Sequence, residues 1–222
     1  MKIVEQSFEI LSPWFDDGTS DDGLLMGFSH EAKLIEKAGR TAYKSEDKIT
    51  MDSYDKFIRS IIKRGHEAVI EFGSMMVKFV TDRGVSHEIV RHRMCSFVQE
   101  STRYCNYGTD KFGGELTVVR PSKWDAWTES MRIDWQDSIR VSETRYLNLL
   151  RIGSTPQEAR SVLPNSLKTE IVVRANFREW RHMFNLRAIS KAVHPDMRSL
   201  MTPLYGKCRA LLPCVFDMGD VE

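Results

Sequence analysis

Residues 91–104 read Arg91-His92-Arg93-Met94-Cys95-Ser96-Phe97-Val98-Gln99-Glu100-Ser101-Thr102-Arg103-Tyr104. Three arginines, a histidine and two serines within thirteen residues are costly to bury unless each polar group finds a partner. Arginine presents its donors in a planar fork that suits phosphate, and Gln99 and Ser101 suit a neutral base or ribose edge. The stretch therefore indicates a site for an anionic ligand. The structural alternative, a salt-bridge cluster with Glu88 and Glu100, remains open at this point.

Regular secondary structure is expected on both sides of this stretch. Apolar residues spaced by three and four, together with N-capping residues, predict helices at 29–43, 53–64, 84–93, 124–152, 156–163, 176–186 and 195–212. Apolar and β-branched runs predict strands at 75–80, 116–119 and 171–173. The tryptophans of 124–152 fall on one stripe that we expect to be buried, and the polar residues 15–23 predict an exposed loop.

Many helices with few strands predict an α+β fold with a modest, mostly antiparallel sheet. No repeat and no Pro/Gly/Ser-rich linker interrupts the chain, so we expect one compact domain over residues 1–222. No apolar run approaches ~18 residues, which excludes a transmembrane helix. The N-terminus lacks the apolar region of a secretory signal. The four cysteines, Cys95, Cys105, Cys208 and Cys214, form no CxxC pair, and we expect reduced thiols in the cytoplasm.

Charge is concentrated in one part of the chain. The formal net charge is +1, yet residues 168–209 carry nine basic and three acidic side chains. A neutral protein with one basic segment suits a local anionic ligand better than a long nucleic-acid track. An ordinary solvated basic face explains the charge alone equally well.

Several familiar motifs are missing from the sequence. It contains no G-x-G-x-x-G, no G-x-x-x-x-G-K-[ST] and no G-x-S-x-G, which argues against a Rossmann fold, a P-loop and a serine-hydrolase elbow. His87 and His92 are five residues apart, whereas a zincin helix needs histidines four apart. We therefore expect no metal site.

A second polar segment covers residues 176–187. Asn176 and Glu179 have the spacing of a helix cap. Arg178, His182 and Asn185 follow one another by four and three residues and share a helix face. The other face carries Trp180, Met183, Phe184 and Arg187.

The two segments together resemble a known family. Residues 91–103 match RHRxxSxxxxSxR, the signature of flavin-dependent thymidylate synthases. Gly65-His66-Glu67, Ala159-Arg160-Ser161-Val162-Leu163-Pro164 and the helix at 176–187 are similar to that family in order and spacing. The chain departs from the pattern at Ala68 and at Glu71-Phe72.

This resemblance implies a homotetramer without a Rossmann fold, with FAD and dUMP bound between subunits. It implies flavin contacts from Arg91, His92, Arg93, Gln99, Asn176, Arg178 and His182. It implies dUMP contacts from Glu88, Arg91, Gln99, Glu100, Ser101, Thr102, Arg103, Arg160 and Arg187. Arg187 is also implied as the catalytic residue that polarises the pyrimidine.

The implied reaction converts dUMP to dTMP with 5,10-methylenetetrahydrofolate as carbon donor and NADPH as reductant. A bound flavin can reduce the pyrimidine directly, so no protein cysteine nucleophile is needed. Arginine is a poor base at its normal pKa, and Arg187 is therefore expected to stabilise charge.

Two other functions remain as alternatives. A nucleic-acid-binding module would use the basic segment at 168–209. A flavin-free methyltransferase would use Cys95 as nucleophile, with a pKa lowered by the neighbouring Arg93. The resemblance favours the flavin enzyme, with no nucleic-acid or membrane partner.

Overall fold

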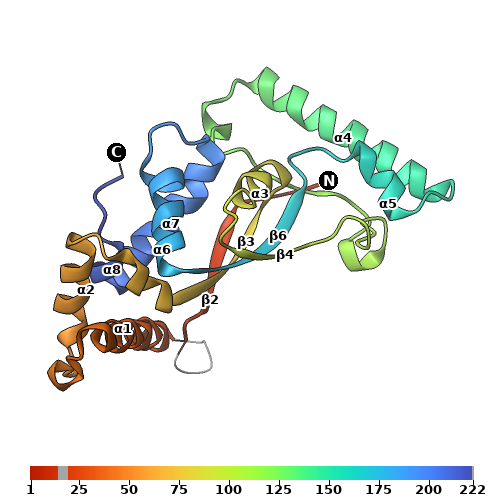
Figure 1. The fold of residues 1–222 in the computed structure, drawn as a ribbon. Helices are drawn as coiled ribbons and strands as arrows, with labels where there is room; N and C mark the ends of the chain where they lie inside the picture. The colour runs from red at the N-terminus through yellow and green to blue at the C-terminus, as the bar shows by residue number, and fades with distance from the viewer. Residues whose placement is uncertain (15–19, 222) are drawn as a thin grey trace. The chain divides into compact units, whose positions relative to one another are not determined.

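The computed structural model describes residues 1–14 and 20–221 and confirms the α+β class, with helices and an antiparallel sheet (Figure 1). Its contacts divide the chain into two compact units. Unit 1 comprises Met1–Ser7, Phe79–Arg91 and Val98–Ile171, and unit 2 comprises Phe8–Lys78, His92–Phe97 and Val172–Glu222. Four strands contain residues of both units, so we keep one domain over residues 1–222 as a proposal.

Those four strands form one sheet, in the order β2-β3-β6-β4. Their bounds are β2 Ser7–Ser12, β3 Ser74–Asp82, β4 Ser96–Gln99 and β6 Lys168–Asn176. Buried and more exposed residues alternate along β3 and β6, as the two faces of a strand require. The strands predicted at 75–80 and 171–173 are therefore confirmed and extend further at both ends. The prediction missed β2.

Unit 1 is built around the C-terminal half of a long helix. Its elements, with 3-10 helices labelled η, are β1 Lys2–Val4, α3 Arg83–Ile89, η3 Asp110–Phe112, β5 Thr117–Val119, η4 Trp124–Ala126, α4 Glu129–Arg151, α5 Pro156–Ala159 and η5 Arg160–Val162. β1 and β5 pair in parallel, with Ile3 opposite Val118. The core consists of Tyr107, Leu116, Tyr146, Ala159 and Leu167.

The long helix is shorter and more exposed than predicted. Thr128 caps it by accepting from the backbone N–H of Met131, so Trp124 and Trp127 lie before α4. Only Ile139 and Tyr146 of α4 are buried. Trp124 and Trp135 are half-buried and meet edge to face, with ring centroids 5.3 Å apart. The expectation of one buried stripe is therefore wrong, because the core of unit 1 lies against the part of α4 around Tyr146 and leaves Trp124, Trp127 and Trp135 half-buried.

Unit 2 is mostly helical and has an aromatic core. Its elements are α1 Asp21–Tyr43, η1 Glu46–Lys48, α2 Ser53–Lys63, η2 Glu67–Phe72, α6 Phe177–Phe184, the π-helix η6 Asn185–Ile189, α7 Pro195–Leu211 and α8 Pro213–Phe216. Phe177 stacks on Phe28 at 5.9 Å, and Phe216 meets Phe177 and Phe184 edge to face at 5.2 and 5.8 Å. These rings join α1, α6 and α8.

Two helix boundaries correct the sequence prediction. α1 begins at Asp21, not at Ser29, because Ser20 accepts from the backbone N–H of Gly23 at 2.9 Å and two aspartates follow in the first turn. The expected loop at 15–23 therefore includes the start of a helix, while its residues 15–19 lie outside the described residues. The helix predicted at 84–93 is shorter in the structure: α3 ends at Ile89, and residues 91–93 lie outside it.

Gly27 marks the place where α1 comes close to the backbone of Pro13, and a substitution there tests this close approach. A Cβ at position 27 would lie 2.6 Å from the carbonyl carbon of Pro13, and backbone cannot swing aside as a side chain can. We expect Gly27→Ala to lower the free energy of unfolding by roughly 1–3 kcal/mol, measured by urea denaturation.

Gly206 provides the matched control, because it also lies inside a helix, α7, and a Cβ there meets nothing within 4 Å. Gly206→Ala should stabilise the protein by about 0.5–1 kcal/mol through helix propensity. Equal effects of the two substitutions would contradict the close approach of α1 to Pro13.

Candidate functional site

Helix α6 presents one face to the aromatic core and the other to a cavity. The side chain of Asn176 accepts from the backbone N–H of Glu179 at 2.9 Å and caps the helix. Trp180 and Phe184 are fully buried, and the indole N–H of Trp180 donates to the carbonyl of Met75 at 3.0 Å. The two predicted faces are confirmed within α6, whereas Asn185 and Arg187 lie in the π-helix η6 that follows it.

The cavity on the outer face of α6 has a volume of about 690 Å³. Its lining includes four of the polar side chains singled out in the sequence, Asn176, Arg178, His182 and Asn185. Three of these, Asn176, Arg178 and His182, are predicted flavin contacts. Sequence reasoning missed Arg181, Glu67, Glu71 and Glu179, which also line the cavity. The volume lies within the usual range of cofactor sites.

Acidic residues of η2 hold the arginines of this cavity. Arg178 donates to Glu71 at 2.6 Å, and this bond raises the pKa of the Arg178 guanidinium. Arg181 donates to Glu67 at 3.3 Å and also to the backbone carbonyl of Val215. The cavity therefore combines positive and negative groups, with the guanidinium orientations set before any ligand binds.

His92 is the buried histidine of the arginine-rich stretch, and it contacts Arg187. Arg187 Nε donates to His92 Nε2 at 3.1 Å, which requires the neutral imidazole to carry its proton on Nδ1. His92 Nδ1 lies 3.6 Å from Glu179 Oε1. Burial first, and then the charges of Arg187 and His182, lower the pKa of His92 to about 4. The ring is therefore neutral at physiological pH.

The three side chains His92, Glu179 and His182 bring one ligand atom each within 4.8 Å of one another. The sequence did not suggest this grouping, because the three residues come from two distant segments. Arg187 places a fixed positive charge against His92, which opposes a bound cation. His87, the other histidine considered for a metal, lies on α3, and His92 lies beyond the end of that helix.

Cys95 does not have the lowered pKa that the alternative of a flavin-free methyltransferase requires. It is half-buried, and its thiol donates to the sulfur of Met183 at 3.7 Å. Burial, followed by the charge of Glu179, raises the pKa of Cys95 to about 12. The neighbouring Arg93 is exposed and does not offset these effects. A thiolate is therefore disfavoured at this position.

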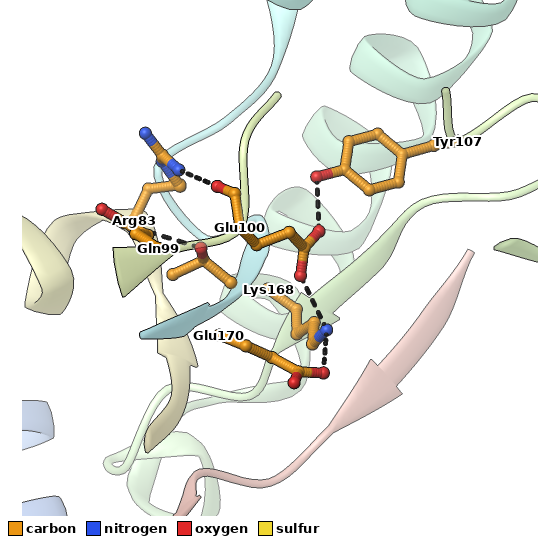
Figure 2. Close-up of polar contacts among 7 residues, drawn as sticks. Arg83, Gln99, Glu100, Tyr107, Lys168 and Glu170 are labelled. Atoms are coloured by element: carbon orange, nitrogen blue, oxygen red, sulfur yellow. Dashed lines mark hydrogen bonds and ion pairs between the residues drawn. The ribbon is translucent and has the colours of Figure 1, made fainter. Parts of the chain in front are cut away.

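In unit 1, Glu100 is held from several sides (Figure 2). Its carboxylate accepts from the hydroxyl of Tyr107 at 2.7 Å and from Lys168 Nζ at 2.9 Å. Lys168 also donates to Glu170 at 2.6 Å, and Arg83 donates to the Glu100 carbonyl at 3.4 Å. The ion-pair partner of Glu100 is thus Lys168, a residue that the sequence reasoning did not single out, and not an arginine of residues 91–103 as the salt-bridge alternative supposed.

Gln99, the neighbour of Glu100, is also fixed by hydrogen bonds within unit 1. Its side-chain amide donates to Ser86 at 2.8 Å and to Thr169 at 3.2 Å, both of which are buried. The hydroxyl of Ser101 accepts from the backbone N–H of Arg103 at 3.3 Å. The segment 99–103 is therefore supported by α3 and β6 and by a local turn.

Thr102 and Arg160 lie together at a second cavity, of about 240 Å³. Arg160 donates to the Thr102 hydroxyl at 3.2 Å. Arg83 and His87 also line this cavity, and none of its described lining residues is acidic. Neither Arg83 nor His87 was among the predicted contacts. Their positions four apart on α3 are the only sequence signal that could have identified them.

The remaining predicted residues divide between the units. Glu88, Arg91 and Arg103 belong to unit 1, where Glu88 is half-buried and the two arginines are exposed. Arg93 belongs to unit 2 and is exposed. Most predicted dUMP contacts thus lie in unit 1, and most predicted flavin contacts lie in unit 2.

The low pKa of His92 predicts a pH-dependent stability. Between pH 6.5 and about 4 the unfolded chain binds a proton at residue 92 that the folded protein does not, so stability falls as pH decreases through this range. This group alone should account for up to about 3 kcal/mol, measured as the difference in unfolding free energy between wild type and His92→Gln at each pH. His30→Gln, at an exposed position of α1, should retain the wild-type dependence. A wild-type slope in His92→Gln would contradict the assignment.

Comparison with known proteins agrees with this geometry. The family model described as "Thymidylate synthase complementing protein" matches residues 24–214. The flavin-dependent thymidylate synthase of Corynebacterium glutamicum is 33% identical over 207 residues, covering 85% of this chain and 80% of that protein. The flavin-dependent thymidylate synthase of Mycobacterium sp. (strain JLS) is 34% identical over 208 residues, covering 83% and 78%.

Solved structures show the same fold at lower identity. The UMP/dUMP methylase PolB of Streptomyces cacaoi, solved with 5-Br dUMP, superposes with a TM-score of 0.75 at 19% identity and covers 98% of this chain and 96% of that one. The family model, the curated relatives and the arginine-rich stretch all indicate the same family, and the solved structures share its fold. The chain is an enzyme that belongs to the flavin-dependent thymidylate synthase family.

Proposed function

We propose that this enzyme makes dTMP from dUMP, with 5,10-methylenetetrahydrofolate as carbon donor, NADPH as reductant and FAD as the bound flavin. The observation that carries the proposal is the distribution of the predicted residues over two cavities. Thr102 and Arg160 line the cavity of unit 1, and Asn176, Arg178 and His182 line the cavity of unit 2. We place the reaction in the cytoplasm.

The cavity of unit 2 fits a flavin cofactor in size and in its donors. Arg178, Arg181 and His182 offer N–H groups for phosphate or ring oxygens, and Met94 and Met218 add apolar surface. Glu67 and Glu71 hold the two arginines, so a cofactor phosphate must share guanidinium donors with these carboxylates. When bound, FAD supplies the reducing equivalents for the pyrimidine.

The cavity of unit 1 suits the nucleotide substrate. Arg83, His87 and Arg160 supply positive or ionisable groups, and Thr102 supplies a hydroxyl. Glu100 is held by Tyr107 and Lys168, so it contributes to the cradle by fixing the backbone of residues 99–103. We keep Glu88, Arg91, Gln99, Ser101 and Arg103 as proposed contacts of dUMP, with Arg91 and Gln99 shared with the flavin.

Arg187 is the proposed catalytic residue. Its contact with neutral His92 holds the guanidinium by a hydrogen bond that removes none of its charge. A positive group held in this way can stabilise the electron density that develops on the pyrimidine as it is reduced. His92 would therefore orient Arg187, in addition to its proposed contact with the flavin alongside Arg93.

We further propose a homotetramer in which subunits complete one another's sites. Large apolar side chains of the arginine-rich stretch are exposed, at 74% for Met94, 74% for Val98 and 78% for Tyr104. Large apolar side chains that are exposed in a ligand-binding segment are candidates for contact with a partner. The flavin chemistry also leaves no role for Cys95 as nucleophile, in agreement with its raised pKa.

Arg187→Ala tests the central role in this proposal. The substitution should lower kcat for dTMP formation about 10²–10³-fold, the usual cost of losing one transition-state donor. The flavin absorbance of the reconstituted protein should be largely retained. Arg174→Ala, at an exposed position of β6, is the control and should keep wild-type kcat. Turnover of Arg187→Ala within a few-fold of wild type would remove Arg187 from this role. A wild-type protein that binds no FAD would overturn the proposed function.

A further inference from the structure

Unit 2 contains a second large cavity, distinct in its lining from the one on α6. It has a volume of about 580 Å³, within the range of nucleotide-sized sites. The lining comes from the end of α1, the segment after it and one face of α2. These residues are Arg40, Tyr43, Ser45, Lys48, Thr50, Ser53, Lys56, Phe57, Ser60 and Arg64. None of them is a predicted contact of dUMP or FAD.

One face of α2 supplies half of this lining. Ser53, the adjacent pair Lys56 and Phe57, Ser60 and the C-cap residue Arg64 recur every three or four residues, the spacing that aligns side chains along a helix. The opposite face carries Arg59, which pairs with Asp55 at 3.0 Å. Lys63 is also exposed on α2 and does not line the cavity. Among the basic residues of α2, Lys56 therefore lines the cavity, whereas Arg59 and Lys63 do not.

The cavity is strongly basic. Its described lining residues include Arg40, Lys48, Lys56 and Arg64 and no aspartate or glutamate. Arg40 is offset by buried Glu36, which accepts from it at 2.8 and 3.0 Å. Lys48, Lys56 and Arg64 come from three positions around the cavity. Several cations that converge without acidic neighbours in the lining favour a ligand with more than one negative charge.

Two aromatic rings hold the guanidinium groups at this site. Arg40 lies over the ring of Phe57, 4.8 Å from its centroid, and Arg64 lies 5.8 Å from the centroid of Tyr43. Arg64 Nε also donates to the carbonyl of Ser60 at 3.2 Å. The hydroxyls of Ser45, Thr50 and Ser60 add donors among the cations. Fixed arginines with interspersed hydroxyls match phosphate oxygens better than an apolar ligand.

A short chain segment connects this cavity to the proposed flavin site. Arg64 lines the basic cavity, and Glu67, three residues later, lines the cavity on α6. Between them, His66 Nδ1 lies 3.1 Å from the hydroxyl of Tyr43, which lines the basic cavity. A ligand bound in the basic cavity therefore contacts residues that are three positions from the lining of the proposed flavin site.

We propose that the basic cavity binds the phosphate groups of the pyridine nucleotide that reduces the flavin. This inference rests on the proposed function, because that reaction requires a phosphorylated reductant to approach the flavin. NADPH carries a pyrophosphate and a further phosphate on its ribose, and therefore presents the multiple negative charges that Lys48, Lys56 and Arg64 favour. No dUMP or FAD contact predicted from the sequence lines this cavity, which leaves it to another substrate.

The test is calorimetric titration of the FAD-reconstituted protein with NADP⁺, which binds without reducing the flavin. Lys56→Met and Arg64→Met should each weaken NADP⁺ about tenfold, and NAD⁺, which lacks the ribose phosphate, should bind wild type more weakly than NADP⁺. Lys63→Met and Arg59→Met are the matched controls, because they remove one lysine and one arginine charge from residues of α2 that do not line the cavity. Both controls should retain wild-type affinity.

Two other results would overturn the inference. Unchanged NADP⁺ affinity in Lys56→Met and Arg64→Met is one, and equal weakening in the Lys63 and Arg59 controls is the other. A third titration, with a polyglutamylated folate, distinguishes carboxylates from phosphates. If the cavity variants weaken the folate and leave NADP⁺ unchanged, the site is not a phosphate site. Wild-type dTMP synthesis, measured in parallel, reports on the proposed function separately.

Discussion

The packing of α6 on an aromatic core is the constraint on which the site of unit 2 depends. Phe177, Trp180 and Phe184 bury one face of this helix, and each such side chain contributes roughly 1.5–3 kcal/mol on burial. Because side chains on a helix have fixed directions, that burial also determines where Arg178 and His182 point. The anchor at Trp180, whose indole N–H bonds the carbonyl of Met75, connects the helix to β3. The buried aromatic residues of α6 thus determine the positions of the polar residues that line the cavity.

The neutral state of His92 is the second condition that the arrangement requires. A protonated imidazole could not accept from Arg187 Nε, and it would add a positive charge beside a guanidinium. Burial therefore lowers the pKa of His92 and in doing so keeps it available as an acceptor for Arg187. Burial likewise raises the pKa of Cys95, so the same exclusion of water that supports Arg187 suppresses thiolate chemistry.

The sequence predicted the two faces of α6 better than it predicted the helix ends and the core. The faces of α6 follow from a 3.6-residue period, and Arg178 and His182, which the period places on one face, both line the cavity there, while their flavin contacts stay predictions. The period also suggested that Trp124 and Trp135 are buried, which is wrong because periodicity identifies an apolar stripe and not what covers it. The role of Lys168 could not be predicted, since its partner Glu100 is 68 residues away in the sequence. The raised pKa of Cys95 depends on burial that no local pattern encodes.

The central claim of this account is that thymidylate chemistry here depends on a flavin and not on a cysteine. The most direct test is NADPH- and methylenetetrahydrofolate-dependent dTMP production by Cys95→Ser, reconstituted with FAD. A serine hydroxyl is a far weaker nucleophile than a thiolate, so a cysteine mechanism would be abolished. We predict a rate within a few-fold of wild type, because Cys95 packs against Met183 and the proposed reaction gives it no chemical role. Complete loss of dTMP formation with FAD still bound would contradict the account.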